Sequence, residues 1–254
     1  MNAYSTKAEL RQIAEYLIAY MRIPYFQEDT VPGKVMEKIL ALVRNAEQLA
    51  TYDYVDVVIR GKVGWQVKST KATTPLTWKR AKIANADALI KNSEKSARGA
   101  QKLGATIIDF CNDHAEKSLR FYDLDEIGYA RLIMFDDHTA IYFERVVCTR
   151  ERPAIFSAGD FNWKWSRQKS TKKKEQLSAL HGTNTRSEKK AFAWHGRGEN
   201  QLHFSGEEDW WPTIVRPAKE GEFNFSGDGH AVAFKLPSRK VAWEGLTKFL
   251  NEAS

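Results

Sequence analysis

The stretch YVDVVIRGKVGWQVKST, Tyr54–Thr70, contains two short apolar segments on either side of Gly61. Residues 57–59 are all β-branched, which suits a buried strand. The apolar residues Val63, Trp65 and Val67 recur at every second position, and this period of two is typical of a strand with one buried face. Because a glycine between two such segments favours a turn, the stretch predicts a β-hairpin.

Three polar side chains of this hairpin fall where they can meet. Asp56 stands at the head of the first strand, while Gln66 and Lys68 lie two residues apart on the second and point to the same face. A carboxylate and neutral oxygens hold Mg²⁺, and an ammonium can orient or help deprotonate an attacking water. The combination suits metal-assisted hydrolysis of a phosphodiester. Asp53 lies outside the apolar run, so we assign it to a turn or to a supporting contact.

The spacing of Asp56, Gln66 and Lys68 resembles the pattern of the PD-(D/E)xK nuclease superfamily, which includes most type II restriction endonucleases. Asp56 matches the first position and Lys68 the last, whereas Gln66 replaces the expected acid, as in some branches of the superfamily. The resemblance covers residues 32–70. It implies an α/β fold with a mixed central β-sheet flanked by helices. It also implies a Mg²⁺ site formed by the Asp56 carboxylate, the Gln66 side-chain oxygen and the Val67 carbonyl, with Lys68 positioning the water.

A plainer interpretation of the same residues stays open. Asp56 would then be a solubilising residue at a strand edge, and Gln66 and Lys68 would lie on the solvent-facing stripe of a half-buried strand. The nuclease interpretation is favoured by the position of the motif in a strand–turn–strand unit that follows a predicted helix.

Gln66 leaves the expected metal site one carboxylate short. A helix is predicted from near Pro32, since proline suits a first helical turn and residues 35–43 carry apolar side chains at helical spacing. Glu37 lies beside this apolar face. In several branches of the superfamily a glutamate on the helix before the Asp strand reaches the metal, so the resemblance makes Glu37 the candidate for the missing carboxylate. The alternative is an early-turn glutamate favoured by the helix dipole.

Composition points to a polyanionic partner. The 254 residues carry a formal net charge of +7, and the pI is about 9.2. The two cysteines, Cys111 and Cys148, lie far apart and lack metal-ligand spacing, so we expect reduced thiols in a cytoplasmic protein. No apolar run is long enough to cross a bilayer, which predicts no membrane association.

The segment after the hairpin is basic, and no acid occurs between Asp56 and Asp87. Basic and hydroxyl side chains beside the proposed catalytic strand would hold a phosphate backbone in register. The candidates for this contact are Ser69, Thr70, Lys71, Lys79 and Arg80. The alternative is a solvated basic loop. Thr74 followed by Pro75 predicts the start of a helix.

Periodicity predicts the remaining elements. Helices are expected over about 6–21, 94–114 and 238–251, and strands over 129–135, 139–147, 222–225 and 231–235. Thr6 and Glu9 have the spacing of a capping box at the start of the first helix. This order of elements is compatible with a mixed α/β core.

The composition changes after Arg150, which predicts a catalytic core over 1–150 and a basic, β-rich DNA-recognition region over 151–254. Between Phe161 and Asn200 ten Lys and Arg face three acids, an excess equal to that of the whole chain. Lysines suit phosphate, while Arg, Asn and Gln read base edges. The DNA-binding candidates of this region are Lys164, Arg167, Lys172, Lys173, Lys174, Arg186, Arg197, Asn200 and Gln201.

These features together predict a Mg²⁺-dependent endonuclease that cuts double-stranded DNA at specific sequences, as type II restriction enzymes do. The resemblance also implies a homodimer acting on palindromic sites, because two-fold protein symmetry mirrors two-fold DNA symmetry. Two alternatives remain. One is a structure-specific or repair nuclease with the same core, and the other is a non-catalytic, basic nucleic-acid-binding protein.

Overall fold

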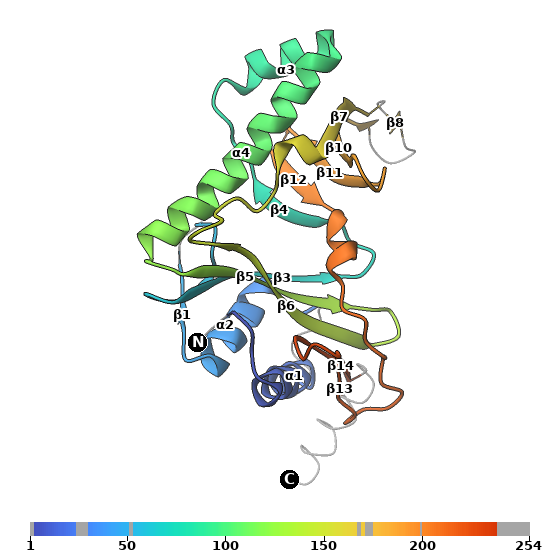
Figure 1. Ribbon diagram of the computed structural model, residues 1–254. Helices are drawn as coiled ribbons and strands as arrows, with labels where there is room; N and C mark the ends of the chain where they lie inside the picture. The colour runs from blue at the N-terminus through green and yellow to red at the C-terminus, as the bar shows by residue number, and fades with distance from the viewer. Residues whose placement is uncertain are drawn as a thin grey trace. The chain divides into compact units, whose positions relative to one another are not determined.

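A computed structural model describes residues 3–23, 30–50, 53–166, 169–170, 175–198 and 200–237 (Figure 1). The chain divides into two compact units. Unit 1 comprises Met1–Thr74, Ser118–Arg150 and Pro212–Ser254, and unit 2 comprises Pro75–Lys117 and Glu151–Trp211. This division departs from the predicted boundary at residue 150. Pro75–Lys117, before that boundary, belongs to unit 2, and Pro212–Ser254, after it, belongs to unit 1.

Unit 1 is built on a seven-stranded sheet in the order β1-β2-β3-β5-β6-β14-β13. β3 and β5 are parallel, and all other neighbours are antiparallel. The mixed α/β class predicted from the sequence is therefore confirmed. The strands span Glu47–Gln48 (β1), Val57–Ile59 (β2), Val63–Lys71 (β3), Glu126–Met134 (β5), Thr139–Thr149 (β6), Asn224–Phe225 (β13) and Ala231–Lys235 (β14).

The predicted hairpin is confirmed as β2 and β3. Val57 pairs with Trp65 and Ile59 with Val63, and Gly61 in the turn has a φ of +71°, which a residue with a side chain rarely adopts. Beyond Trp65, β3 leaves β2 and continues along β5 as far as Lys71. This separation of two neighbouring strands creates the edge at which the candidate site lies.

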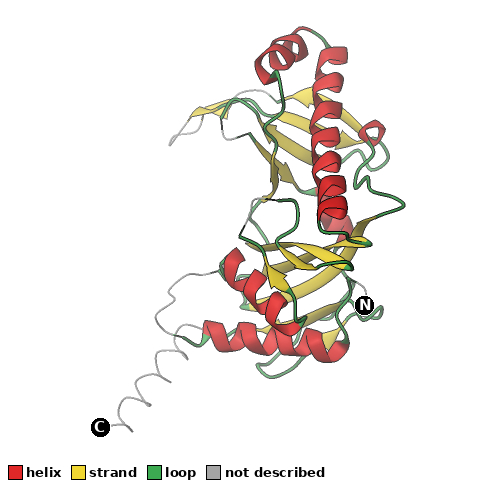
Figure 2. Cartoon of the chain, turned by 90° about the vertical axis from the view of Figure 1, so that its left-hand side faces the viewer, coloured by secondary structure: helices red, strands yellow, loops and turns green. Residues whose placement is uncertain are grey.

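Helices α1 (Lys7–Met21) and α2 (Gly33–Val43) cover one face of this sheet (Figure 2). The predicted capping box is present, since Thr6 Oγ1 accepts from the Glu9 N–H and the Glu9 carboxylate accepts from the Thr6 N–H. The core beneath the helices contains Leu10, Leu40, Trp65, Val67 and Leu132. Because Trp65 and Val67 face the helices, the intervening Gln66 and the following Lys68 face the other side of the sheet.

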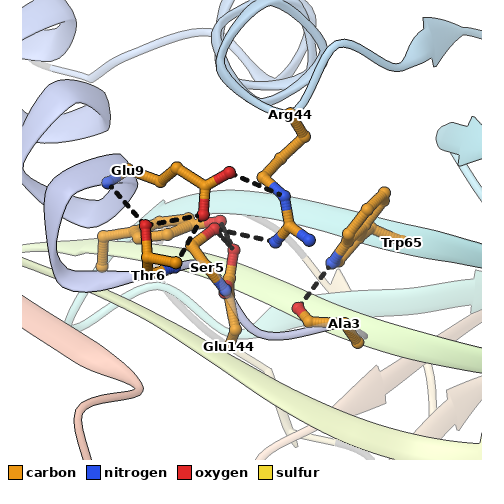
Figure 3. Close-up of polar contacts among 8 residues, drawn as sticks. Ala3, Ser5, Thr6, Glu9, Arg44, Trp65 and Glu144 are labelled. Atoms are coloured by element: carbon orange, nitrogen blue, oxygen red, sulfur yellow. Dashed lines mark hydrogen bonds and ion pairs between the residues drawn. The ribbon is translucent and has the colours of Figure 1, made fainter. Parts of the chain in front are cut away.

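A buried polar cluster ties the N-terminal segment to this sheet (Figure 3). The Ser5 hydroxyl donates to Glu144 at 2.8 Å and accepts from Arg44 Nη1 at 3.0 Å. The Arg44 guanidinium lies 4.8 Å from the centre of the Trp65 ring, and Trp65 Nε1 donates to the Ala3 carbonyl at 2.9 Å. Burial raises the pKa of Glu144, whereas hydrogen bonds from the Tyr142 hydroxyl and from Ser5, together with the charge of Arg44, oppose that rise.

Unit 2 contains a five-stranded antiparallel sheet in the order β4-β12-β11-β10-β7 and a two-stranded sheet. Helix α4 (Ala97–Phe121) is the long helix of Figure 1, and α3 (Ala86–Lys95) precedes it. Two short 3₁₀ helices span Ala158–Asp160 (η1) and Gly206–Trp210 (η2). The strands span Leu76–Arg80 (β4), Phe161–Trp165 (β7), Lys169–Ser170 (β8), Glu175–Gln176 (β9), Leu180–Asn184 (β10), Lys190–His195 (β11) and Gln201–Phe204 (β12).

The helix predicted to start at Pro75 is wrong, because residues 76–80 form β4. Leu76 and Trp78 are buried at alternate positions, and β4 pairs with β12, more than a hundred residues later in the chain. The predicted 94–114 helix is confirmed as α4, which begins at Ala97 and extends to Phe121. The pairing of β4 with β12 overrides the local helix signal of Thr74 followed by Pro75.

Other predicted strands are confirmed as β5, β6, β13 and β14, although β13 covers only Asn224–Phe225. Cys111 and Cys148 are buried free thiols, and burial raises the pKa of each to about 12. Among the helices that the structure describes, none is long and apolar enough to span a bilayer. The helix predicted over 238–251 lies outside the described residues.

Candidate active site

Asp56 lies at the edge where β2 and β3 separate. Its N–H donates to the Trp65 carbonyl at 2.7 Å, and its Oδ2 accepts from the Val67 N–H at 2.7 Å. The carboxylate thus takes the place that a neighbouring strand would occupy along β3. Because the N–H and C=O of one strand residue point to the same edge, the Val67 carbonyl also points to this side. The predicted proximity of Asp56 to the Val67 backbone is present in the structure.

Glu37 of α2 lies in the same neighbourhood and is only 7% exposed. Its Oε2 accepts from Lys34 Nζ at 2.7 Å and from Gln48 Nε2 at 3.0 Å. Its charge acts on the Asp56 carboxyl, so the two carboxylates are within electrostatic range of each other. The role of Glu37 as a metal ligand stays a prediction.

The start of α2 is held against β3. Ser69 Oγ donates to the carbonyl of Val31, just before the helix, at 2.6 Å. This bond links the strand that carries Lys68 to the helix that carries Glu37. Ser69, predicted to contact DNA, thus has a structural contact that positions the site.

The electrostatics of Asp56 reflect this crowding. Burial raises the pKa of its carboxyl above the usual range for Asp, and the Glu37 charge raises it further. The Lys68 ammonium and the hydrogen bond from the Val67 N–H oppose that rise without cancelling it. A buried carboxyl beside a second carboxylate is stabilised by added positive charge, which a divalent cation would supply.

Gln66 is 2% exposed and lies on the same strand face as Lys68, as predicted. Its role as an oxygen ligand stays a prediction. Among the residues that the structure describes, no three His, Cys, Asp or Glu side chains gather at one point. A cation here would therefore be held by the two carboxylates together with amide, carbonyl or water oxygens. Oxygen ligands of this kind fit Mg²⁺, which keeps several of its waters.

Three residues near the site were missed by sequence reasoning. Lys34 and Gln48 contact Glu37, and neither has a local pattern that would reveal this. Arg131 lies opposite Lys68 on β5, is 1% exposed, and donates from Nη2 to Thr70 Oγ1 at 2.7 Å. An arginine inside the apolar run of residues 127–134 was a usable signal, because such a residue is rarely buried without a specific partner.

The remaining DNA-binding candidates are spread over both units. Lys71 ends β3 in unit 1, whereas Lys79 and Arg80 belong to β4 of unit 2. Within unit 2, Lys164 is an exposed residue of β7, and Gln201 begins β12. Asn200 precedes β12 with a φ of +55°. Arg167, Lys172, Lys173 and Lys174 lie outside the described residues.

The two arginines proposed to read bases already contact acids. Arg186 lies 3.7 Å from the Asp160 carboxylate. Arg197 forms an ion pair with Glu94 and lies 5.8 Å from the centre of the Trp165 ring. Exposed ion pairs of this kind contribute about 0–1 kcal/mol, so a phosphate or a base could displace either acid.

Comparisons of the chain with protein-family models, with curated proteins and with solved structures each found no match. The resemblance to the PD-(D/E)xK superfamily therefore stays a prediction. At one edge of a mixed sheet, Asp56 Oδ2 accepts from the Val67 N–H, and the charges of Lys68 and Glu37 both act on the Asp56 carboxyl.

Proposed function

We propose that this protein is a Mg²⁺-dependent endonuclease that hydrolyses phosphodiester bonds of double-stranded DNA at specific sites. The proposal is supported by one observation: where β2 leaves β3, the Asp56 carboxyl accepts from the Val67 N–H and lies within electrostatic range of Lys68 and Glu37. A solubilising residue at a strand edge would not be partly buried within electrostatic range of a second carboxylate and a lysine. The net charge of +7 supports a polyanionic substrate.

Each residue has a defined task in this reaction. Asp56 and Glu37 would hold the cation through their carboxylates, and Gln66 and Val67 would add neutral oxygens. When bound, Mg²⁺ stabilises negative charge on the scissile phosphate and lowers the pKa of a water. Lys68 orients that water for in-line attack on phosphorus. The new P–O bond replaces the bond to the leaving oxygen, which takes up a proton, and the products are a phosphate monoester and a hydroxyl.

Lys34 and Gln48 position Glu37 rather than touch the substrate. Both donate to the same carboxylate oxygen, Oε2. These two hydrogen bonds fix the orientation of the carboxylate and therefore the position of Oε1. Lys34 also balances charge, because its ammonium lowers the pKa of Asp56. A cation that binds here must therefore compete with the ammonium groups of Lys34 and Lys68 for the two carboxylates.

The direct test is incubation of the purified protein with a large plasmid, with Mg²⁺ and with Mg²⁺ plus a chelator. Discrete bands that disappear with chelator are expected. A smear would indicate a nuclease without sequence specificity, and intact plasmid that is nevertheless retarded on a gel would indicate a binding protein. Recognition of a palindromic site would support the homodimer, which sedimentation of the complex can check.

Metal binding can be tested independently of cleavage. Because a cation binds the folded state only, Mg²⁺ should raise the melting temperature of the wild-type protein. The rise should be lost in Asp56→Asn and kept in Lys38→Ala, which changes an exposed residue of the same helix as Glu37. An equal rise in all three proteins would place the metal elsewhere.

A further inference from the structure

The five-stranded sheet of unit 2 has one face that packs against α4. The Trp163 ring of β7 lies so close to Gly104 of α4 that an added Cβ would be 2.1 Å from it. Gln101 of the same helix donates to the Phe161 carbonyl at 2.7 Å. Asn162 and Lys164, which alternate with these two aromatic residues, are exposed. Strand alternation therefore defines a second face of the sheet, which we call the outer face.

A row of aligned residues crosses the outer face from one edge strand to the other. Thr77 of β4 is opposite His203 of β12, and His203 is opposite Ala193 of β11. Ala193 is opposite His181 of β10, which is opposite Lys164 of β7. At the usual strand spacing this row is roughly 19 Å long. The alanine at its centre leaves room between two histidines for a close approach.

The charged residues in the strands of this sheet are all basic. None of its five strands contains Asp or Glu, although four Lys and Arg and three His occur in them. Beside the first row, Arg80 is opposite Gln201 and Gln201 is opposite His195. The rings of His195 and His203 are 4.9 Å apart. Hydrogen-bond donors and cations on strands without carboxylates match the phosphates and sugars of a nucleic acid.

We propose that the outer face holds the sugar–phosphate backbone of a DNA duplex. This inference deepens the proposed function and rests on it for the choice of DNA. The contact is independent of sequence, because lysine, histidine and threonine donors meet phosphate oxygens. The row of side chains lies on strands of a rigid sheet, so it fixes the register of the duplex. Base reading is left to residues of the turns, such as Arg186 and Arg197.

The test measures binding of a fluorescent duplex by anisotropy, without Mg²⁺ and at several salt concentrations. Lys164→Glu should weaken binding at least tenfold on cognate and random duplexes alike, and should reduce the slope of log K against log salt by roughly 0.9. Lys102→Glu is the matched control, since it makes the same charge change at an exposed residue of α4. Its affinity should stay within about twofold of the wild type.

A second variant, Ala193→Glu, places a carboxylate at the centre of the row and should weaken binding more than Lys164→Glu. Circular dichroism of each variant checks that it is folded. Equal affinities for Lys164→Glu and Lys102→Glu would overturn the inference. The inference would also be overturned if the wild type bound single-stranded RNA more tightly than the duplex and Lys164→Glu abolished that RNA binding.

The two proposals can fail separately. If the wild type binds the duplex through the outer face but never cleaves it with Mg²⁺, the nuclease proposal fails and the surface stands. If the wild type cleaves and Lys164→Glu binds and cleaves as well as the wild type, the surface fails and the nuclease proposal stands.

Discussion

Both sheets of this protein bury aromatic rings, but among the described residues only the strands of the seven-stranded sheet also bury charged side chains. The seven-stranded sheet of unit 1 buries Arg131 of β5 and Glu144 of β6, and Glu37 is buried on helix α2 of the same unit. The five-stranded sheet of unit 2 buries aromatic rings. Phe192, for example, lies 4.9 Å from Phe204 between ring centres. The buried acids of unit 1 cost desolvation energy, whereas the aromatic residues of unit 2 contribute both area and ring contacts.

This difference separates two tasks. A buried carboxylate lowers stability unless hydrogen-bond donors or a cation surround it. The position of the Asp56 carboxyl within electrostatic range of Lys68 is therefore better explained by the proposed reaction than by a contribution to stability. An aromatic core needs no polar partners, and it leaves the opposite side of the sheet to lysine, histidine and threonine. This contrast fits the reactive site proposed for unit 1 and the DNA-binding face proposed for unit 2.

The largest effect is expected at Lys68. If its ammonium orients the attacking water as proposed, Lys68→Ala should lower the cleavage rate by about 10²–10⁴-fold and leave duplex affinity nearly unchanged. Lys62→Ala, in the exposed turn between β2 and β3, is the control with the same loss of charge. Single-turnover cleavage and anisotropy give the two readouts. A Lys68→Ala protein with near-normal turnover would remove the catalytic assignment and the contrast between the units.

The next effect tests the aromatic core. Phe192 is fully buried among Phe156, Phe161, Trp163 and Phe204. Phe192→Ala should reduce the free energy of unfolding by about 3–5 kcal/mol, measured by denaturant melts.

The control for this change is Phe121→Ala, because that ring is 76% exposed. It should change stability by less than about 0.5 kcal/mol. A similar loss in both variants would show that the aromatic cluster contributes no special stability to unit 2.

Gln66 offers a smaller effect that sharpens the description of the metal site. Gln66→Glu adds a hard anionic ligand and should keep Mg²⁺- or Mn²⁺-dependent cleavage at a measurable rate. Gln66→Leu has a similar shape but no oxygen, and its cleavage should fall below that of Gln66→Glu by roughly tenfold. Equal rates would mean that this side chain does not touch the metal.

The smallest effect concerns the pH dependence of stability. Because burial raises the pKa of Asp56 in the folded protein, the folded state binds more protons than the unfolded chain between the usual Asp pKa and the raised one. Stability contributed by this group therefore falls as pH rises through that window. In metal-free buffer, Asp56→Asn should melt a few degrees higher than wild type near neutral pH.

The difference between the two proteins should shrink as the pH is lowered toward the usual Asp pKa, where the carboxyl is protonated in both states. Thermal melts over a pH series measure this. If Asp56→Asn melted at a lower temperature than the wild type at neutral pH, the charge of Asp56 would stabilise the fold. That result would contradict the expectation for an acid whose pKa is raised by burial.

Local patterns in the sequence predicted the parts of the fold that depend on nearby residues. The hairpin around Gly61 and the capping box of Thr6 and Glu9 both involve residues within a few positions of one another. The relative placement of Asp56 and Lys68 also followed, because strand alternation and a short turn determine it. The mixed sheet and most of its strands were predicted for the same reason.

Tertiary structure alone decided how distant segments combine. Leu76 and Phe204 pair across 128 residues, which turned an expected helix into β4 and moved residues 75–117 into unit 2. The contacts of Gln48 with Glu37 and of Arg131 with Thr70 likewise join separate elements. Hydrophobic period and capping report only the few residues around a position, whereas strand pairing and buried ion contacts depend on which surfaces meet after the chain has folded.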